Sequence, residues 1–133
     1  MKKIFEEDAL QERFEKALAM HESVRKVIAN KVDMSNPMAV LNQLSDIQSV
    51  QALAAQSKAM LTYLTEKFTL RKLTKLNMEN MGAMEKKSVL SSEIGDVSFW
   101  DNVSELLIKE MHYQIDILRS ALSYCKQEMN NLN

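Results

Sequence analysis

The chain has 133 residues, of which 46% are apolar and 26% charged, and its formal net charge is −1. This length corresponds to about one domain. The composition excludes a disordered chain, and the charge excludes a strongly basic nucleic-acid binder. Two glycines and one proline supply too few turns for a sheet protein, so the expected fold is all-α.

The first helix is expected from about residue 4 to residue 32, because apolar side chains recur there at alternating steps of four and three. The residues of this stripe are Leu10, Phe14, Ala17, His21, Val24 and Ile28. A polar linker follows the helix. In that linker Asn36 is placed to cap the next helix, and Pro37 is placed to occupy its first position.

The second helix is expected from residue 37 to about residue 80, a stretch without glycine and without a further proline. Its apolar stripe begins at Val40 and continues past Phe68, where the periodicity drifts. A continuous helix and a helix broken between residues 68 and 80 both fit that drift. Small side chains between Ala52 and Ala59 predict that a neighbouring helix approaches closely there.

The third helix is expected from Ser98 to about residue 132, where Ser98 and Asp101 resemble a capping box. Residues 81–97 contain both glycines, Gly82 and Gly95, and are interpreted as a connector, in which a short helical turn and a short strand-like piece at Ser88–Ser91 are the alternatives. The apolar residues of the third helix alternate steps of three and four without a miss, which is the pattern of a heptad seam in a coiled coil. The seam residues are Ile108, Met111, Ile115, Leu118, Leu122, Cys125, Met129 and Leu132.

The lengths of these helices predict self-association. At about 1.5 Å per residue the second helix spans roughly 65 Å and the third roughly 50 Å, whereas a compact domain of this size is under about 40 Å across. Each Leu or Ile left exposed on an overhanging turn forfeits about 1.5–3 kcal/mol of burial. We therefore expect one elongated helical hairpin or bundle, completed by homo-oligomerisation through the heptad seam.

This single domain, residues 1–133, divides into three parts: an N-terminal helix and linker (1–36), a basic central helix and connector (37–97), and a C-terminal heptad helix (98–133). No stretch approaches about 18 uninterrupted apolar residues, so no transmembrane helix is expected. The N-terminal stretch has acidic residues where a signal peptide needs an apolar run. The single cysteine excludes an intramolecular disulfide, and the predicted location is the cytoplasm.

The reactive side chains point to no active site. His21 falls in the stripe of the first helix and is interpreted as a buried packing residue, and His112 lies one turn before Asp116, as in a surface pair. Cys125 falls within the seam and is interpreted as a small buried hydrophobe. The sequence has no metal-ligand cluster, phosphate-binding loop or nucleophile elbow. We expect no enzyme, no metal or other cofactor, and no small-molecule substrate.

Positive charge is concentrated in the middle of the chain. Residues 58–87 carry seven basic and three acidic side chains, whereas residues 88–133 carry three basic and seven acidic ones. Lys67, Arg71 and Lys75 recur every four residues and form one ridge, with Tyr63 one turn before it. Such a row suits a phosphate backbone with a base stacked on the ring; a solvated face that complements the acidic third helix is the alternative. The candidate nucleic-acid-binding residues are Lys58, Tyr63, Lys67, Arg71, Lys72 and Lys75.

Three stretches together resemble the phage recombination mediators of the UvsY family: YLTEKFTLRKLTKL, KKSVLSS and IDILRSALSYCKQEM. The resemblance covers roughly residues 33–130. In the last helix it places a basic residue, a serine and a further lysine at Arg119, Ser120 and Lys126. It implies a small helical protein that forms ring-like homo-oligomers, binds single-stranded DNA and loads a RecA-like recombinase onto strands coated by a single-strand-binding protein. It also implies that the DNA-contacting basic segment falls on Arg71, Lys72 and Lys75.

Two functions are therefore expected as alternatives. The first is a non-enzymatic, homo-oligomeric single-stranded-DNA-binding recombination mediator, whose partners are itself, single-stranded DNA, a recombinase and a single-strand-binding protein. The second is a helical structural, adaptor or chaperone subunit of a phage or secretion assembly, without nucleic-acid binding. Neither function involves a membrane, and a phage-encoded protein would act in the host cytoplasm.

Overall fold

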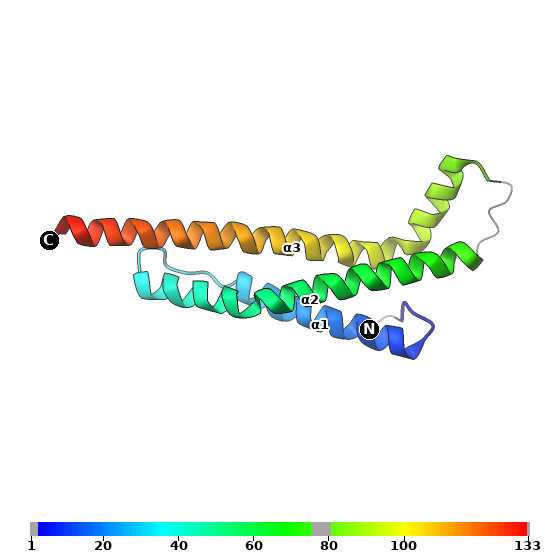
Figure 1. Ribbon diagram of the computed structural model, residues 1–133, viewed down its shortest axis with the longest axis horizontal. Coiled ribbons are helices and arrows are strands. Elements are labelled where there is room, and N and C mark those ends of the chain that lie inside the picture. Colours follow the sequence, from blue (N-terminus) through cyan, green and yellow to red (C-terminus); the bar gives the residue numbers. More distant parts are fainter. Residues whose placement is uncertain (1–2, 76–80, 133) are drawn as a thin grey trace.

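The computed structural model describes residues 3–75 and 81–132, and within these residues it contains three helices and no strand. The helices are α1 (Asp8–Ile28), α2 (Pro37–Lys75) and α3 (Ala83–Leu132). They run alternately up and down in an elongated array, and α2 packs against both α1 and α3 (Figure 1). The expected all-α fold with three main helices is confirmed.

The start of α2 confirms the predicted cap. The Asn36 side-chain oxygen accepts hydrogen bonds from the backbone N–H groups of Met38 and Ala39, at 3.1 and 3.2 Å. Pro37 is the first helical residue, where its missing N–H leaves no bond unmade. The helix α2 continues without a break to Lys75, so no break falls between residues 68 and 75, whereas residues 76–80 lie outside the described part of the structure.

The first helix is shorter than expected at both ends, because it ends at Ile28 rather than near residue 32 and begins only at Asp8. Before Asp8 a side chain, rather than helical hydrogen bonds, holds the backbone. The backbone N–H groups of Ile4 and Phe5 both donate to the Gln11 side-chain oxygen, at 2.9 and 3.0 Å. Phe5 is buried and packs against Phe14 and Phe68, with ring centroids 5.7 and 5.5 Å apart. The N-terminal segment is thereby fixed across the C-terminal half of α2.

Two apolar clusters form the core, one towards each end of the array. The first, near the α1–α2 linker, contains Val24, Ile28, Val40, Leu44, Ile47, Ala54, Met111, Ile115 and Leu118. The second, near the N-terminal segment, contains Phe5, Leu10, Phe14, Ala17, Leu61, Leu64 and Val97. The small side chains of α2 permit a close contact with α1, as predicted, since the Ser57 hydroxyl donates to the Ala17 carbonyl at 2.9 Å.

The third helix begins fifteen residues before the expected position, at Ala83, so residues 83–97 are helical rather than a connector. The Gly82 carbonyl accepts the first helical hydrogen bond, from the Lys86 N–H at 2.9 Å. Gly95 lies inside the helix at a cost of about 1 kcal/mol, which the complete burial of nearby Val97 offsets. Figure 1 shows the yellow-green first part of α3 tilted away from the rest, and a glycine–serine pair, Gly95 with Ser98 bonded to its carbonyl, is a common cause of such bends.

The heptad seam of α3 is covered mainly by its own chain. Met111, Ile115 and Leu118 are buried against the end of α1 and the start of α2. Cys125 is also buried, with its thiol 4.0 Å from the Met34 carbonyl of the α1–α2 linker. Ile108 and Leu122 pack on the same cluster and are partly buried. The expectation that these residues need a second chain is wrong, because the α1–α2 hairpin supplies the missing surface. Met129 and Leu132, 61% and 86% exposed, lie on the end of α3 that projects beyond the other helices (Figure 1).

Candidate nucleic-acid interface

The C-terminal half of α2 directs one face into the core and the opposite face to solvent. Leu61 and Leu64 are buried, so Tyr63 and Lys67, four residues apart, share the exposed face. The Lys67 ammonium lies 5.7 Å from the centroid of the Tyr63 ring, in a cation–π contact. The structure therefore brings together two predicted residues, the exposed ring of Tyr63 and the positive charge of Lys67.

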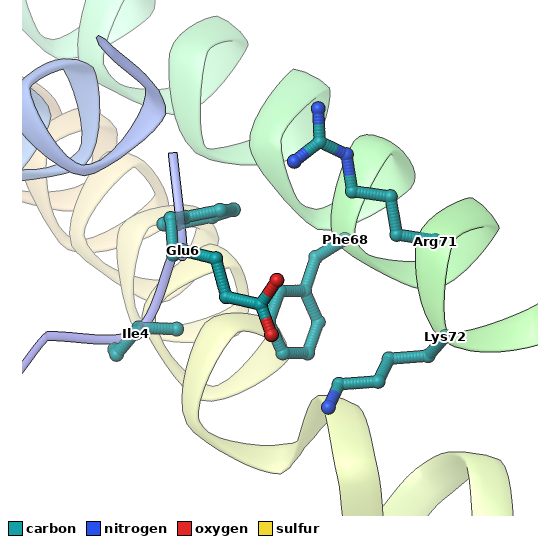
Figure 2. Close-up of a pocket in the computed structure, with 6 residues that line it drawn as sticks. Ile4, Glu6, Phe68, Arg71 and Lys72 are labelled. Carbon is teal, nitrogen blue, oxygen red and sulfur yellow. The ribbon is translucent and has the colours of Figure 1, made fainter. Parts of the chain in front are cut away.

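A second aromatic–cation pair lies on the neighbouring face, beneath the N-terminal segment. The Lys72 ammonium lies 5.3 Å from the centroid of the Phe68 ring. Figure 2 shows the side chains of Glu6, Phe68 and Lys72 directed towards one another, whereas the guanidinium of Arg71 points away from them. Phe68 is partly buried under this segment, so its ring is less accessible than that of Tyr63.

Arg71 is engaged by the same N-terminal segment. Its guanidinium forms an ion pair with the Glu7 carboxylate, 64 positions earlier in the chain. Both side chains stay partly exposed, at 39% and 57%, so the pair is open to competition from another anion. Glu7 was missed by sequence analysis, and its place in an acidic run at residues 6–8 is the one feature that could have drawn attention to it.

Lys58 does not belong to this surface, which corrects the prediction. Its ammonium donates to the Asp101 carboxylate at 2.7 Å and to the Asp101 backbone carbonyl at 3.3 Å. The Thr62 hydroxyl donates to the same carboxylate oxygen at 2.7 Å. Lys58 and Lys67 are nine positions apart, which places them on opposite sides of a helix. Lys58 therefore joins α2 to α3.

The remaining predicted cation, Lys75, is the last residue of α2, and its side chain lies outside the described part of the structure. The first turns of α3 add two exposed lysines, Lys86 and Lys87, at the same end of the molecule (Figure 1). We call this region the basic end. Its described cations are Lys67, Arg71, Lys72, Lys86 and Lys87.

The histidines and the cysteine lie away from the basic end. His21 is buried, as predicted, and stacks edge-on against Trp100 with ring centroids 5.7 Å apart. Burial lowers the pKa of the His21 imidazole, and within the described residues its Nδ1 has no hydrogen-bond partner. Cys125 is buried in the seam and His112 is exposed. Across residues 3–75 and 81–132, no three His, Cys, Asp or Glu side chains are grouped as metal ligands.

Comparison with known proteins yields no relative: no family model, no curated protein and no solved structure matches this chain. None of the helices in the described residues has a stretch long and apolar enough to cross a membrane.

Proposed function

We propose that this protein is a non-enzymatic, homo-oligomeric single-stranded-DNA-binding protein that acts as a recombination mediator, and that the basic end holds the strand. The observation that carries the proposal is the Tyr63–Lys67 pair. An exposed ring accepts a stacked base, and the ammonium beside it neutralises the adjoining phosphate. Single strands are the preferred substrate, since only unpaired bases present a free face to stack.

The distribution of charge supports binding at one end of the molecule. Residues 88–133 carry seven acidic and three basic side chains, so most of α3 repels a phosphate backbone. The basic end gathers five described cations around the end of α2 and the start of α3. Glu6, Glu7, Glu66 and Glu85 offset part of this positive charge. We therefore expect a strand to bind beside Tyr63 and Lys67 rather than along the more acidic body of α3.

The mediator role is proposed from the resemblance of the basic segment, the KKSVLSS stretch and the C-terminal helix to the UvsY family. We expect a protein that passes a strand to a recombinase to bind it weakly enough to release it, because weak binding goes with fast dissociation. One small basic end per chain, with Arg71 already shared with Glu7, suits such weak binding. Several copies in an assembly then increase the overall affinity through effective concentration.

A second candidate function is a protein-binding adaptor without nucleic-acid activity. It is favoured by the apolar end of α3, where Met129 and Leu132 are uncovered on a projecting helix. Amphipathic helix ends of this kind dock into grooves of partner proteins.

Fluorescence anisotropy with a labelled oligothymidine separates the two functions. At low salt we expect the wild type to bind, and Tyr63→Ala/Lys67→Ala to bind about 5- to 150-fold more weakly, the equivalent of about 1–3 kcal/mol for one lost stacking contact. The double variant should also reduce the slope of log affinity against log salt by about 0.7. Lys26→Ala, which removes an exposed lysine of α1, is the matched control and should bind like the wild type. Absence of wild-type binding at low salt would favour the adaptor.

A further inference from the structure

A second apolar stripe runs along α3, on the side that faces away from the seam and that α1 and α2 leave open. We call it the outer stripe, and its members are Phe99, Leu106, Tyr113, Ile117 and Tyr124. They lie seven, seven, four and seven positions apart, so they form one straight face of the helix. All five are exposed in the structure. Single exposed apolar residues are common on protein surfaces, but a regular row of them indicates a contact surface.

We propose that the outer stripe binds the outer stripe of a second copy of this chain, with the two α3 helices antiparallel about a two-fold axis. When two copies of the stripe run in opposite directions, apolar residues of one copy lie opposite apolar residues of the other. The alignment places Phe99 opposite Tyr124 and Leu106 opposite Ile117 of the second copy. The one charged position within the stripe, Glu110, then lies opposite Tyr113, whose hydroxyl is a donor for the carboxylate.

The charges beside the stripe select the antiparallel direction. One flank carries, in order, Glu105, Lys109, His112 and Asp116. In an antiparallel pair this flank faces itself, so Lys109 meets Asp116 of the second copy and Asp116 meets its Lys109. In a parallel pair it would face the other flank, which has no charge at the corresponding positions: Trp100, Leu107, Gln114 and Ala121.

Asp116 is available for this contact, because it has no ion-pair partner in the part of the chain that the structure describes. Lys109 has only a long intrahelical contact, 3.7 Å from the Glu105 carboxylate, with both side chains mostly exposed. The two-fold pairing therefore gains ion pairs without breaking a strong one.

A groove beside the outer stripe can bind an apolar side chain of the second copy. It has a volume of about 400 Å³ and lies between the α1–α2 linker and α3, with Val32, Met34, Tyr113 and Ile117 in its wall. In the proposed alignment Leu106 of the second copy lies opposite Ile117 and enters this groove. The five exposed side chains offer roughly 600 Å² per copy, since aromatic side chains bury about 150–250 Å² each. That area is near the lower limit for a specific interface, which predicts a dimer of micromolar affinity.

Light scattering coupled to size exclusion tests the contact without DNA. The inference deepens the homo-oligomer part of the proposed function, and its failure leaves the DNA-binding test unaffected. At about 100 µM we expect twice the 15.3 kDa of one chain. Leu106→Glu should give the mass of one chain, and the matched control Leu70→Glu, on α2, should not, because Leu106 and Leu70 are 63% and 61% exposed. Circular dichroism verifies that both variants fold.

A charge exchange tests the direction of the pairing. Asp116→Lys places a lysine opposite Lys109 and should weaken the dimer at least tenfold, whereas Lys109→Asp/Asp116→Lys restores opposite charges and should recover it. A single-chain mass for the wild type at about 100 µM, or a dimeric Leu106→Glu, would overturn the proposal. A double exchange that is no better than Asp116→Lys alone would overturn the antiparallel geometry.

Discussion

The Asp101 carboxylate is the polar link between α2 and α3, and its removal is expected to destabilise the fold. It accepts the Lys58 ammonium and the Thr62 hydroxyl through one oxygen, both at 2.7 Å. The two charged side chains are 27% and 20% exposed. Breaking a fully buried pair costs about 3–5 kcal/mol, and breaking an exposed one costs about 0–1 kcal/mol. For this intermediate burial we expect Asp101→Ala to lower the free energy of unfolding by about 2 kcal/mol.

Urea denaturation measures that loss. With a slope of about 1–3 kcal/mol per molar urea, the midpoint should fall by roughly 1 M while the slope stays the same. Asp46→Ala, at an exposed aspartate of α2, is the control and should stay within about 0.5 kcal/mol of the wild type. Lys58→Met should also destabilise the protein, yet leave its DNA affinity unchanged. Equal midpoints for Asp101→Ala and the control, or weakened DNA binding by folded Lys58→Met, would refute the assignment of Lys58 to the fold.

Three further predictions concern the buried histidine, the N-terminal segment and the bend of α3. Because burial lowers the pKa of His21 below its usual 6.5, the unfolded chain binds a proton that the folded chain does not, so stability should fall as pH drops below about 6.5. His21→Leu should flatten that dependence in urea titrations from pH 7 to 5 (conditions bracketing an ordinary histidine pKa of about 6.5), and an unchanged profile would contradict it. Glu7→Gln should release Arg71 and tighten oligothymidine binding about 2- to 5-fold at low salt; weaker binding would show that Glu7 does not compete with the strand. Gly95→Ala, whose added Cβ meets nothing within 4 Å, should raise the unfolding free energy by about 0.5–1 kcal/mol, and a lower melting temperature would refute this.

The features that depend on near neighbours in the chain could be predicted from the sequence. The Asn36 cap and the stripe of α1 are set by spacing within a few turns, and the structure shows both. The buried places of His21 and Cys125 followed from the same periodicity. In this chain the sequence therefore predicts where helices form and which face of each helix is buried.

The features that depend on distant segments could not be predicted. A heptad seam specifies an apolar partner but not whether it belongs to the same chain, and here the α1–α2 hairpin covers residues from Ile108 to Cys125. The early start of α3 was hidden by Gly82 and Gly95, because local propensity does not include the burial of Val97. The outer stripe is also visible in the sequence, at spacings of seven and four. The seam has more apolar residues, so the sequence alone favours the seam as the contact surface.

For the candidate site, the sequence predicts which side chains share a helix face, but not which other segments surround them. Tyr63 and Lys67 share an exposed face because they are four positions apart, which the helical period alone dictates. Lys58 was included although the same period places it opposite Lys67. The contact of Glu7 with Arg71 joins segments 64 positions apart, and no local pattern indicates it.

The most direct test of the account is to locate the bound strand on the protein. Ultraviolet crosslinking to an oligonucleotide that carries bromodeoxyuridine, followed by tryptic digestion and mass spectrometry, identifies the side chains on which bases stack. We expect crosslinks in peptide 59–67, which contains Tyr63, and their loss in Tyr63→Ala. Crosslinks confined to α1 or to residues 88–132 of α3 would contradict binding at the basic end.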